Sequence, residues 1–136
     1  MTQVIYLDMD GTIADLYQGE WRADLIAEKV EPYKNAKRLI DEKTLLNLVE
    51  CGYELGIISW TSKQGTKEYN AKVRKAKREW LKVNYPHISF TEIHIVKYNT
   101  PKHNVAKVKH QILVDDELQN RLAWKGQAFH PQDFFR

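Results

Sequence analysis

The feature that most constrains the fold of this chain is a series of short apolar runs separated by longer segments with helical periodicity. Each run is about four to six residues long and rich in β-branched or aromatic side chains, which is typical of buried strands. We expect strands at Val4–Leu7, Tyr53–Ile58, Glu92–Val96 and Gln111–Val114, and a short edge strand at Gly126–Phe129. Strands that alternate with helices favour parallel pairing through right-handed crossovers. The pattern predicts an α/β fold with an open, mainly parallel, Rossmann-like sheet of about five strands and helices on both faces.

Two segments between these strands have the periodicity of amphipathic helices. The first extends from Lys34 to Cys51, where Gly52 follows as a helix-terminating glycine. Its apolar residues recur at steps of three and four: Ala36, Leu39, Ile40, Leu46 and Val49. The second is expected over 64–84, before Pro86, and its apolar face carries Tyr69, Val73, Ala76, Trp80 and Val83. These two helices are the expected main cover of the sheet.

The length of the chain, 136 residues, fits a single domain covering 1–136. Residues 13–33 interrupt the regular alternation, and we expect them to form a small insertion over the strand ends. The one cysteine, Cys51, has no partner for an internal disulfide, which suits a reducing cytoplasm. No apolar stretch approaches the ~20 residues of a membrane-spanning helix, and the N-terminus lacks the pattern of a secretory leader. We therefore expect a cytoplasmic protein without a membrane partner.

Acidic side chains follow two of the expected inner strands. Asp8 and Asp10 come after the first strand, Asp115 and Asp116 follow the fourth, and Ser59 follows the second. The carboxyl ends of parallel strands meet at one edge, where ligands bind in open α/β sheets. An isolated Asp-x-Asp-Gly sequence is also a common solvated turn, but four converging carboxylates repel one another unless a cation neutralises them. A hard divalent ion, most simply Mg²⁺, takes oxygen ligands and keeps positions open for a phosphate.

The sequence resembles the haloacid dehalogenase superfamily of aspartate-nucleophile phosphohydrolases in four separated motifs. These are Asp8–Thr12, Ser59 after Gly56–Ile58, a lysine near Thr100–Lys102, and Asp115–Asp116 after Ile112–Val114. The motifs follow the order and the strand-end positions of the family, and together they span the chain from Val4 to Glu117. Within that superfamily, the sequence resembles in general terms the phage and bacterial nucleotidase-like members with a minimal cap. The resemblance implies one haloacid dehalogenase-like hydrolase domain with phosphoric monoester hydrolase activity.

The resemblance also implies a role for each aspartate. Asp8 would attack phosphorus and carry an aspartyl-phosphate, which splits one difficult hydrolysis into two steps. Asp10 would protonate the leaving oxygen and then deprotonate the attacking water. Asp8, the main-chain carbonyl of Asp10, and Asp115 would hold Mg²⁺, with Asp116 as an additional carboxylate. The two acids of the first motif are thus expected to divide the chemistry between them.

Hydroxyl and ammonium groups complete the set that the resemblance implies. Ser59 and Thr12 would bind phosphate oxygens, and a lysine would offset the charge that gathers on the phosphoryl group. Lys102 precedes a short helix-like segment before the fourth strand, which matches the family, whereas Lys97 lies at the end of the third strand. We expect Lys102 to be the active-site lysine, with Lys97 as the alternative.

A receiver domain of two-component signalling also combines carboxylates, a hydroxyl residue and a lysine on a parallel sheet. That class places adjacent acids after the first strand and its acceptor aspartate after a middle strand. Here Ser59 takes the middle position, and the adjacent acids Asp115 and Asp116 come last. The order of the motifs therefore disfavours a receiver domain.

The insertion and the long helix bear on the substrate. An insertion of about twenty residues cannot enclose a large substrate, so the site should be open and suit a nucleotide or a phosphorylated nucleic-acid end. Residues 63–82 carry eight Lys and Arg against two Glu, which suits nucleic-acid phosphates, although a solvated outer helix face explains the same charges. The alternative function is a nucleic-acid-binding module with a vestigial phosphatase site.

Overall fold

The computed structural model describes residues 2–135 and contains a five-stranded sheet in the order β5-β4-β1-β6-β7. Every neighbouring pair in this sheet is parallel. The strands are β1 (Val4–Leu7), β4 (Glu54–Trp60), β5 (Glu92–Val96), β6 (Ile112–Val114) and β7 (Gln127–Phe129). The predicted fold class, an open parallel α/β sheet with helices on both faces, is confirmed.

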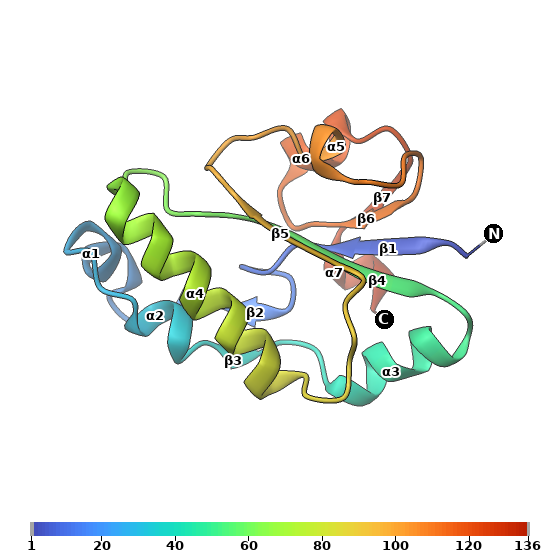
Figure 1. The fold of residues 1–136 in the computed structure, drawn as a ribbon, viewed down its shortest axis with the longest axis horizontal. Helices are drawn as coiled ribbons and strands as arrows, with labels where there is room; N and C mark the ends of the chain where they lie inside the picture. Colours follow the sequence, from blue (N-terminus) through green and yellow to red (C-terminus); the bar gives the residue numbers. More distant parts are fainter. Residues whose placement is uncertain (1, 136) are drawn as a thin grey trace.

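Helices cover both faces of the sheet because the buried strands are apolar on both sides (Figure 1). In β1, Ile5 and Leu7 belong to one core cluster, while Val4 and Tyr6 belong to a second cluster on the opposite face. The first face packs against α3 (Glu42–Glu50), α4 (Lys67–Asn84) and α7 (Pro131–Phe134). The second face is covered by α5 (Lys102–Val105) and by Trp124, which directly follows α6 (Leu118–Ala123). Among the described residues, no helix is long and apolar enough to cross a membrane.

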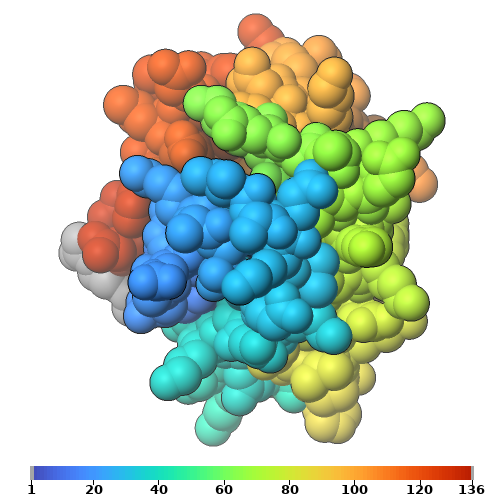
Figure 2. Space-filling model, turned by 90° about the vertical axis from the view of Figure 1, so that its left-hand side faces the viewer, coloured from blue at the N-terminus to red at the C-terminus, as the bar shows by residue number. Residues whose placement is uncertain are grey.

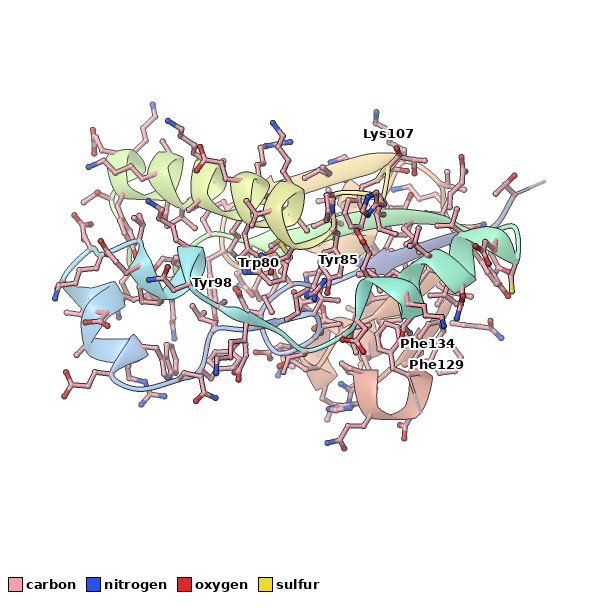
Figure 3. All side chains as sticks on the ribbon, turned by 90° about the horizontal axis from the view of Figure 1, so that it is seen from below. Trp80, Tyr85, Tyr98, Lys107, Phe129 and Phe134 are labelled. Atoms are coloured by element: carbon pink, nitrogen blue, oxygen red, sulfur yellow. The ribbon has the colours of Figure 1, made fainter. Side chains whose placement is uncertain are left out.

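Aromatic pairs close the first core at two places (Figure 3). Trp80 of α4 and Tyr85 at its C-terminal end have ring centroids 5.7 Å apart, and Phe129 of β7 and Phe134 of α7 have centroids 5.5 Å apart. Trp80 and Tyr85 are buried, and truncating a buried ring typically costs about 3–5 kcal/mol, whereas Phe129 and Phe134 are partly buried. The two pairs therefore stabilise the attachment of α4 and of the C-terminal segment to the sheet.

The helix predicted over 34–51 is wrong in its first half, because α2 (Glu31–Lys34) ends where that prediction begins and α3 begins only at Glu42. Lys37–Arg38 instead forms β3, which pairs antiparallel with β2 (Ala14–Asp15). Side chains at the C-terminal end of α4 keep residues 36–40 extended. Trp80 Nε1 donates to Ala36 O at 2.7 Å, and the Tyr85 hydroxyl donates to Ile40 O at 2.7 Å. A continuous helix would have used these carbonyls internally. Long-range hydrogen bonds thus override the local periodicity.

The long helix α4 begins three residues later than predicted, because the Thr66 hydroxyl caps it by accepting from Tyr69 N at 3.1 Å. Its buried face also differs from the predicted one. Val83 is 76% exposed, whereas Lys77 and Leu81 are buried. The buried stripe is therefore Tyr69, Val73, Ala76, Lys77, Trp80 and Leu81.

The insertion at 13–33 contains β2 and α1 (Trp21–Ile26), and α2 (Glu31–Lys34) overlaps its end. It packs on the N-terminal half of α4, where Leu16 and Tyr33 join a small core with Tyr69. The Tyr69 hydroxyl donates to Lys29 O at 2.6 Å. Figure 2 looks onto this end of the molecule, where the insertion (blue to cyan) occupies the middle and the green segment after β4 lies above it. The insertion is therefore anchored on α4 beside the carboxyl ends of the strands.

Candidate active site

The structure brings three of the four predicted acidic side chains together at the carboxyl edge of the sheet. β1 and β6 are neighbours, and Asp8 N donates to Val114 O at 3.0 Å, which aligns the residues that follow both strands. Carboxylate oxygens of Asp8, Asp115 and Asp116 lie within 4.8 Å of one another. These acids are distant in sequence, so parallel pairing is what places them side by side.

Lys102 lies between two of these carboxylates. Its Nζ is 2.8 Å from Asp8 Oδ1 and 2.7 Å from Asp115 Oδ2, and the residue is only 3% exposed. Burial alone lowers the pKa of this ammonium, but the two carboxylates outweigh burial and the net pKa is raised. Lys97, the alternative lysine, is exposed in the turn after β5. Of the two candidates, the structure therefore places Lys102 at the carboxylates.

Asp116 lies against Gly11, in the turn after β1. Gly11 has a φ of +82°, and a Cβ at this position would overlap the Asp116 carboxylate. Burial, and then the neighbouring Asp8, raise the pKa of Asp116 to about 8. Asp116 Oδ1 is buried without a hydrogen-bond partner among the described residues. The site therefore contains a carboxylate oxygen that the surrounding protein groups leave unpaired.

The donor set fits a hard divalent cation. Asp8, Asp115 and Asp116 offer only oxygen atoms, and an unpaired buried oxygen is costly unless a ligand satisfies it. The Asp115 carboxylate is oriented by Asn120 Nδ2 at 3.0 Å and by Glu117 N at 2.9 Å. Burial, followed by the Asp8 charge, raises the pKa of Asp115, as expected for an acidic cluster that lacks a full complement of positive charge.

We expect Mg²⁺ binding to strengthen with rising pH, because the ion needs Asp116 ionised and its pKa in the metal-free protein is about 8. Apparent affinity should rise by up to roughly tenfold per pH unit below pH 8 and then level off, with release of a proton. Without metal, Asp116 keeps its proton in the folded state above the unfolded pKa of about 4. Its contribution to stability should therefore fall as pH rises from about 4 to 8.

Calorimetric titration with Mg²⁺ at pH 6.5 and 8.5, in buffers of different ionisation enthalpy, measures both the affinity and the released proton. An Asp116→Asn variant is the control and should show a flatter pH dependence. Affinity that is equal at both pH values would contradict the expectation.

The predicted hydroxyl residues and Asp10 surround this cluster. Thr12 Oγ1 donates to Asp8 Oδ2 at 3.2 Å. β4 continues two residues beyond its predicted end, so Ser59 lies inside the strand and pairs with Ile95 of β5. The Asp10 carboxylate does not join the three-carboxylate cluster, because its Oδ2 is 2.7 Å from Lys77 Nζ. The first motif thus directs its two carboxylates to different partners.

Lys77 is a site residue that sequence reasoning missed, since it was assigned to the solvated basic face of 63–82. It is 1% exposed, and its Nζ lies 2.7 Å from Asp10 Oδ2 and 2.7 Å from Ser59 Oγ. The sequence did contain a pattern that predicts burial of this residue. Lys77 is four residues after Val73 and three before Trp80, so helical periodicity places it on the apolar stripe.

Two aromatic pairs lie near the carboxylates. Tyr17 and Trp21 of the insertion are in edge contact at 4.9 Å, and burial followed by Asp10 raises the pKa of Tyr17. Trp60 and Tyr98 are in edge contact at 5.0 Å. The Lys102 ammonium is 5.4 Å from the Trp60 ring centre. The second aromatic pair therefore lies next to the lysine that contacts Asp8.

The chain shares its α/β fold with two solved structures, a phosphatase and a hydrolase. No family model matches the chain, and no curated protein matches it. Among solved structures, it is similar to D,D-heptose 1,7-bisphosphate phosphatase from Burkholderia thailandensis, with a TM-score of 0.56 and 14% identity over 90% of this chain and 71% of that one. It is also similar to a haloacid dehalogenase-like family hydrolase from Streptococcus pneumoniae, with a TM-score of 0.56 and 12% identity over 97% and 96% of the two chains. At these identities the similarity concerns the fold.

Proposed function

We propose that this protein is a Mg²⁺-dependent phosphatase that hydrolyses a phosphomonoester through an aspartyl-phosphate. The observation that carries the proposal is the convergence of Asp8, Asp115 and Asp116 around the buried Lys102 at the carboxyl edge of the sheet. The shared fold supports it, since one of the similar structures is a phosphatase and the other a hydrolase. The roles below follow from this arrangement together with the motif resemblance.

In the first step, an Asp8 carboxylate oxygen attacks phosphorus, and the bond from phosphorus to the ester oxygen breaks. Thr12 donates to Asp8 Oδ2 and Lys102 contacts Oδ1, so both oxygens of the nucleophile are oriented. Asp10 donates a proton to the departing oxygen, which leaves as an alcohol. In the second step Asp10 takes a proton from water, the water oxygen attacks phosphorus, and the bond to Asp8 breaks to release inorganic phosphate.

The remaining side chains bind the phosphoryl group. The Ser59 hydroxyl donates to a phosphate oxygen, and the Lys102 ammonium offsets the charge that gathers in the transition state. Asp8, the Asp10 carbonyl, Asp115 and Asp116 hold Mg²⁺. When bound, this ion supplies charge neutralisation that lets an anionic carboxylate approach an anionic phosphate.

A nucleotide or a phosphorylated nucleic-acid end is the proposed substrate. The pairs Tyr17–Trp21 and Trp60–Tyr98 offer aromatic surface on which a base stacks, at ~1–3 kcal/mol per base. Arg22 lies 5.2 Å from the Trp21 ring centre and Lys63 lies 5.8 Å from that of Tyr98. Each pair thus has a cation beside one of its rings, which suits a further phosphate.

The basic segment 63–82 supports nucleic-acid binding only in part. Arg74 Nε donates to Ile95 O at 3.1 Å and Arg78 Nη2 donates to Ile93 O at 3.3 Å, so both arginines cover the edge strand β5. Lys77 is buried in the site. The exposed cations of this segment that a nucleic-acid backbone can reach are Lys63, Lys67, Lys72, Lys75, Arg78 and Lys82.

A substrate panel with and without Mg²⁺ tests the proposed function. We expect hydrolysis of a generic phosphate ester that EDTA abolishes, with higher kcat/KM for nucleoside monophosphates or for 3′- or 5′-phosphorylated oligonucleotides than for sugar phosphates. No Mg²⁺-dependent hydrolysis of any ester would remove the enzymatic proposal. Mg²⁺-independent, salt-sensitive oligonucleotide binding without hydrolysis would favour the alternative, a nucleic-acid-binding module.

Asp10→Asn should slow the reaction without preventing Mg²⁺ binding. The variant keeps the main-chain carbonyl and loses only the proton-transfer group, so we expect a loss of ~10²- to 10⁴-fold in kcat/KM. A good leaving group needs less protonation, so the loss should be smaller on a p-nitrophenyl ester than on an alkyl phosphate when the first step limits the rate. Equal losses on both esters would argue against Asp10 as the general acid.

A further inference from the structure

We propose that Lys77 is a positioning residue that orients Asp10 and Ser59 for phosphoryl transfer. The inference rests on the proposed phosphatase function. It concerns a residue on α4 that none of the four motifs contains. Figure 1 shows the N-terminal half of α4 beside α1 and α2, and the contacts of Lys77 with Asp10 and Ser59 connect this helix to the strand ends.

All three protons of the Lys77 ammonium have an acceptor. Nζ lies 2.7 Å from Asp10 Oδ2, 2.7 Å from Ser59 Oγ and 2.7 Å from Trp60 O. A lysine ammonium has three donors and accepts no hydrogen bond. Every donor of the ammonium is therefore occupied, and three hydrogen bonds fix the position of Nζ.

This arrangement constrains the Ser59 hydroxyl. Ser59 Oγ accepts a hydrogen bond from Lys77 Nζ, so the hydroxyl's own proton has to point to a different acceptor. In the proposed function that acceptor is a phosphate oxygen. Lys77 thereby converts Ser59 into a directed donor and adds positive charge beside the phosphoryl group.

The same contact constrains Asp10. Its side chain is 20% exposed and is held through one oxygen, Oδ2. That ion pair fixes the carboxylate near the site and leaves the second oxygen to exchange the proton. Fixing a proton-transfer group before the reaction avoids the cost of ordering it in the transition state.

Lys77 is also enclosed by the insertion. The ammonium lies 5.1 Å from the centre of the Tyr33 ring, and Tyr33 is 4% exposed. An aromatic face attracts a cation and excludes water from it, which strengthens the contacts that the ammonium makes. One ammonium thus joins the turn after β1, strand β4, helix α4 and the insertion.

Core packing alone does not explain a lysine at this position. The buried stripe of α4 is otherwise apolar or aromatic, and replacing a buried ion pair by well-packed apolar residues is often neutral or stabilising. Two of the three acceptors belong to side chains that the proposed mechanism uses. The contacts of Lys77 therefore match a role in the site better than a role in stability.

The test is a Lys77→Met variant, assayed with Mg²⁺ on an alkyl phosphate and on a p-nitrophenyl ester. Misplacing a catalytic group by about 1 Å costs up to ~10²-fold, so we expect ~10- to 100-fold loss of kcat on the alkyl ester. The loss should be several-fold smaller on the p-nitrophenyl ester, because Lys77 acts partly through acid catalysis by Asp10. In an Asp10→Asn background the substitution should lower kcat by a smaller factor than in the wild type.

Lys43→Met, an exposed lysine on α3, is the matched control and should leave both rates unchanged. A merely structural Lys77 would lower the active fraction, so both esters would lose the same factor and the Asp10→Asn background would change nothing; that result overturns the inference. If Lys77→Met does not fold, Lys77→Gln and Lys77→Arg supply the same ratio of losses. A wild type inactive on both esters refutes the proposed phosphatase, whereas an active wild type with equal losses refutes only the role of Lys77.

Discussion

The Asp8→Asn protein is expected to be folded and to hydrolyse no phosphate ester above the uncatalysed rate. The substitution removes the attacking oxygen and one metal contact while keeping the size of the side chain, so both chemical steps should vanish. Loss of a nucleophile typically costs at least about 10⁴-fold in kcat, and kcat/KM with Mg²⁺ on a p-nitrophenyl ester measures it. Beryllium fluoride, which mimics an aspartyl-phosphate, should bind the wild type at Asp8 and should not bind the variant.

The same variant has a second expected property that separates chemistry from folding. Asp8, Asp115 and Asp116 crowd one another around a single ammonium, that of Lys102. Removing the Asp8 charge relieves the repulsion among the acids, and Lys102 keeps Asp115 as its counter-charge. Without Mg²⁺ the Asp8→Asn protein should therefore unfold at the same or a higher temperature than the wild type. A beryllium fluoride adduct on Asp10, Asp115 or Asp116 would refute the assignment of the nucleophile.

Lys102→Met is expected to lower both activity and stability. The ammonium contacts Asp8 and Asp115, and all three groups are buried. Removing one partner of a buried ion pair costs about 3–5 kcal/mol, because the remaining charges lack compensation. Urea unfolding of the metal-free proteins measures the loss, and Mg²⁺ should restore part of it by neutralising the same carboxylates.

Lys97→Met is the matched control, since Lys97 is the other lysine that the sequence offers and it is exposed. It should change the free energy of unfolding by less than about 0.5 kcal/mol and leave kcat unchanged. If Lys97→Met removed activity while Lys102→Met retained it, the assignment of the active-site lysine would be reversed.

Local sequence patterns predicted most of the strands. The bounds of Val4–Leu7 and Glu92–Val96 agree with the structure to the residue, because each is a buried run between clear turn signals. The second inner strand was predicted two residues short. The apolar run stops at Ser59, yet Ser59 and Trp60 continue to pair with Ile95 and Val96 of β5. Strand pairing depends on the partner strand, so its end cannot be read from one run alone.

The segment 34–41 shows the opposite failure, a local pattern that long-range contacts override. Its apolar spacing suits a helix, but its carbonyls bond to Trp80 and Tyr85, which are more than forty residues away along the chain. Helix periodicity describes one face of one segment and contains no information on such donors. β2 and β3 are two residues each, too short to leave a periodic signal.

The fold class and the positions of the acids after the inner strands were decided by local chemistry. Burial on both faces makes inner strands apolar, and the polar residue that ends each run lies at the ligand-binding edge. The choice among the basic residues was decided by tertiary structure. Sequence position favoured Lys102 over Lys97, and helical periodicity placed Lys77 on an apolar stripe, but neither identifies the side chains that each lysine contacts. Long-range packing buries Lys77 and Lys102 beside carboxylates and leaves Lys97 in solvent. A lysine's environment is set by whichever elements the fold brings against it, and those elements lie far away along the chain.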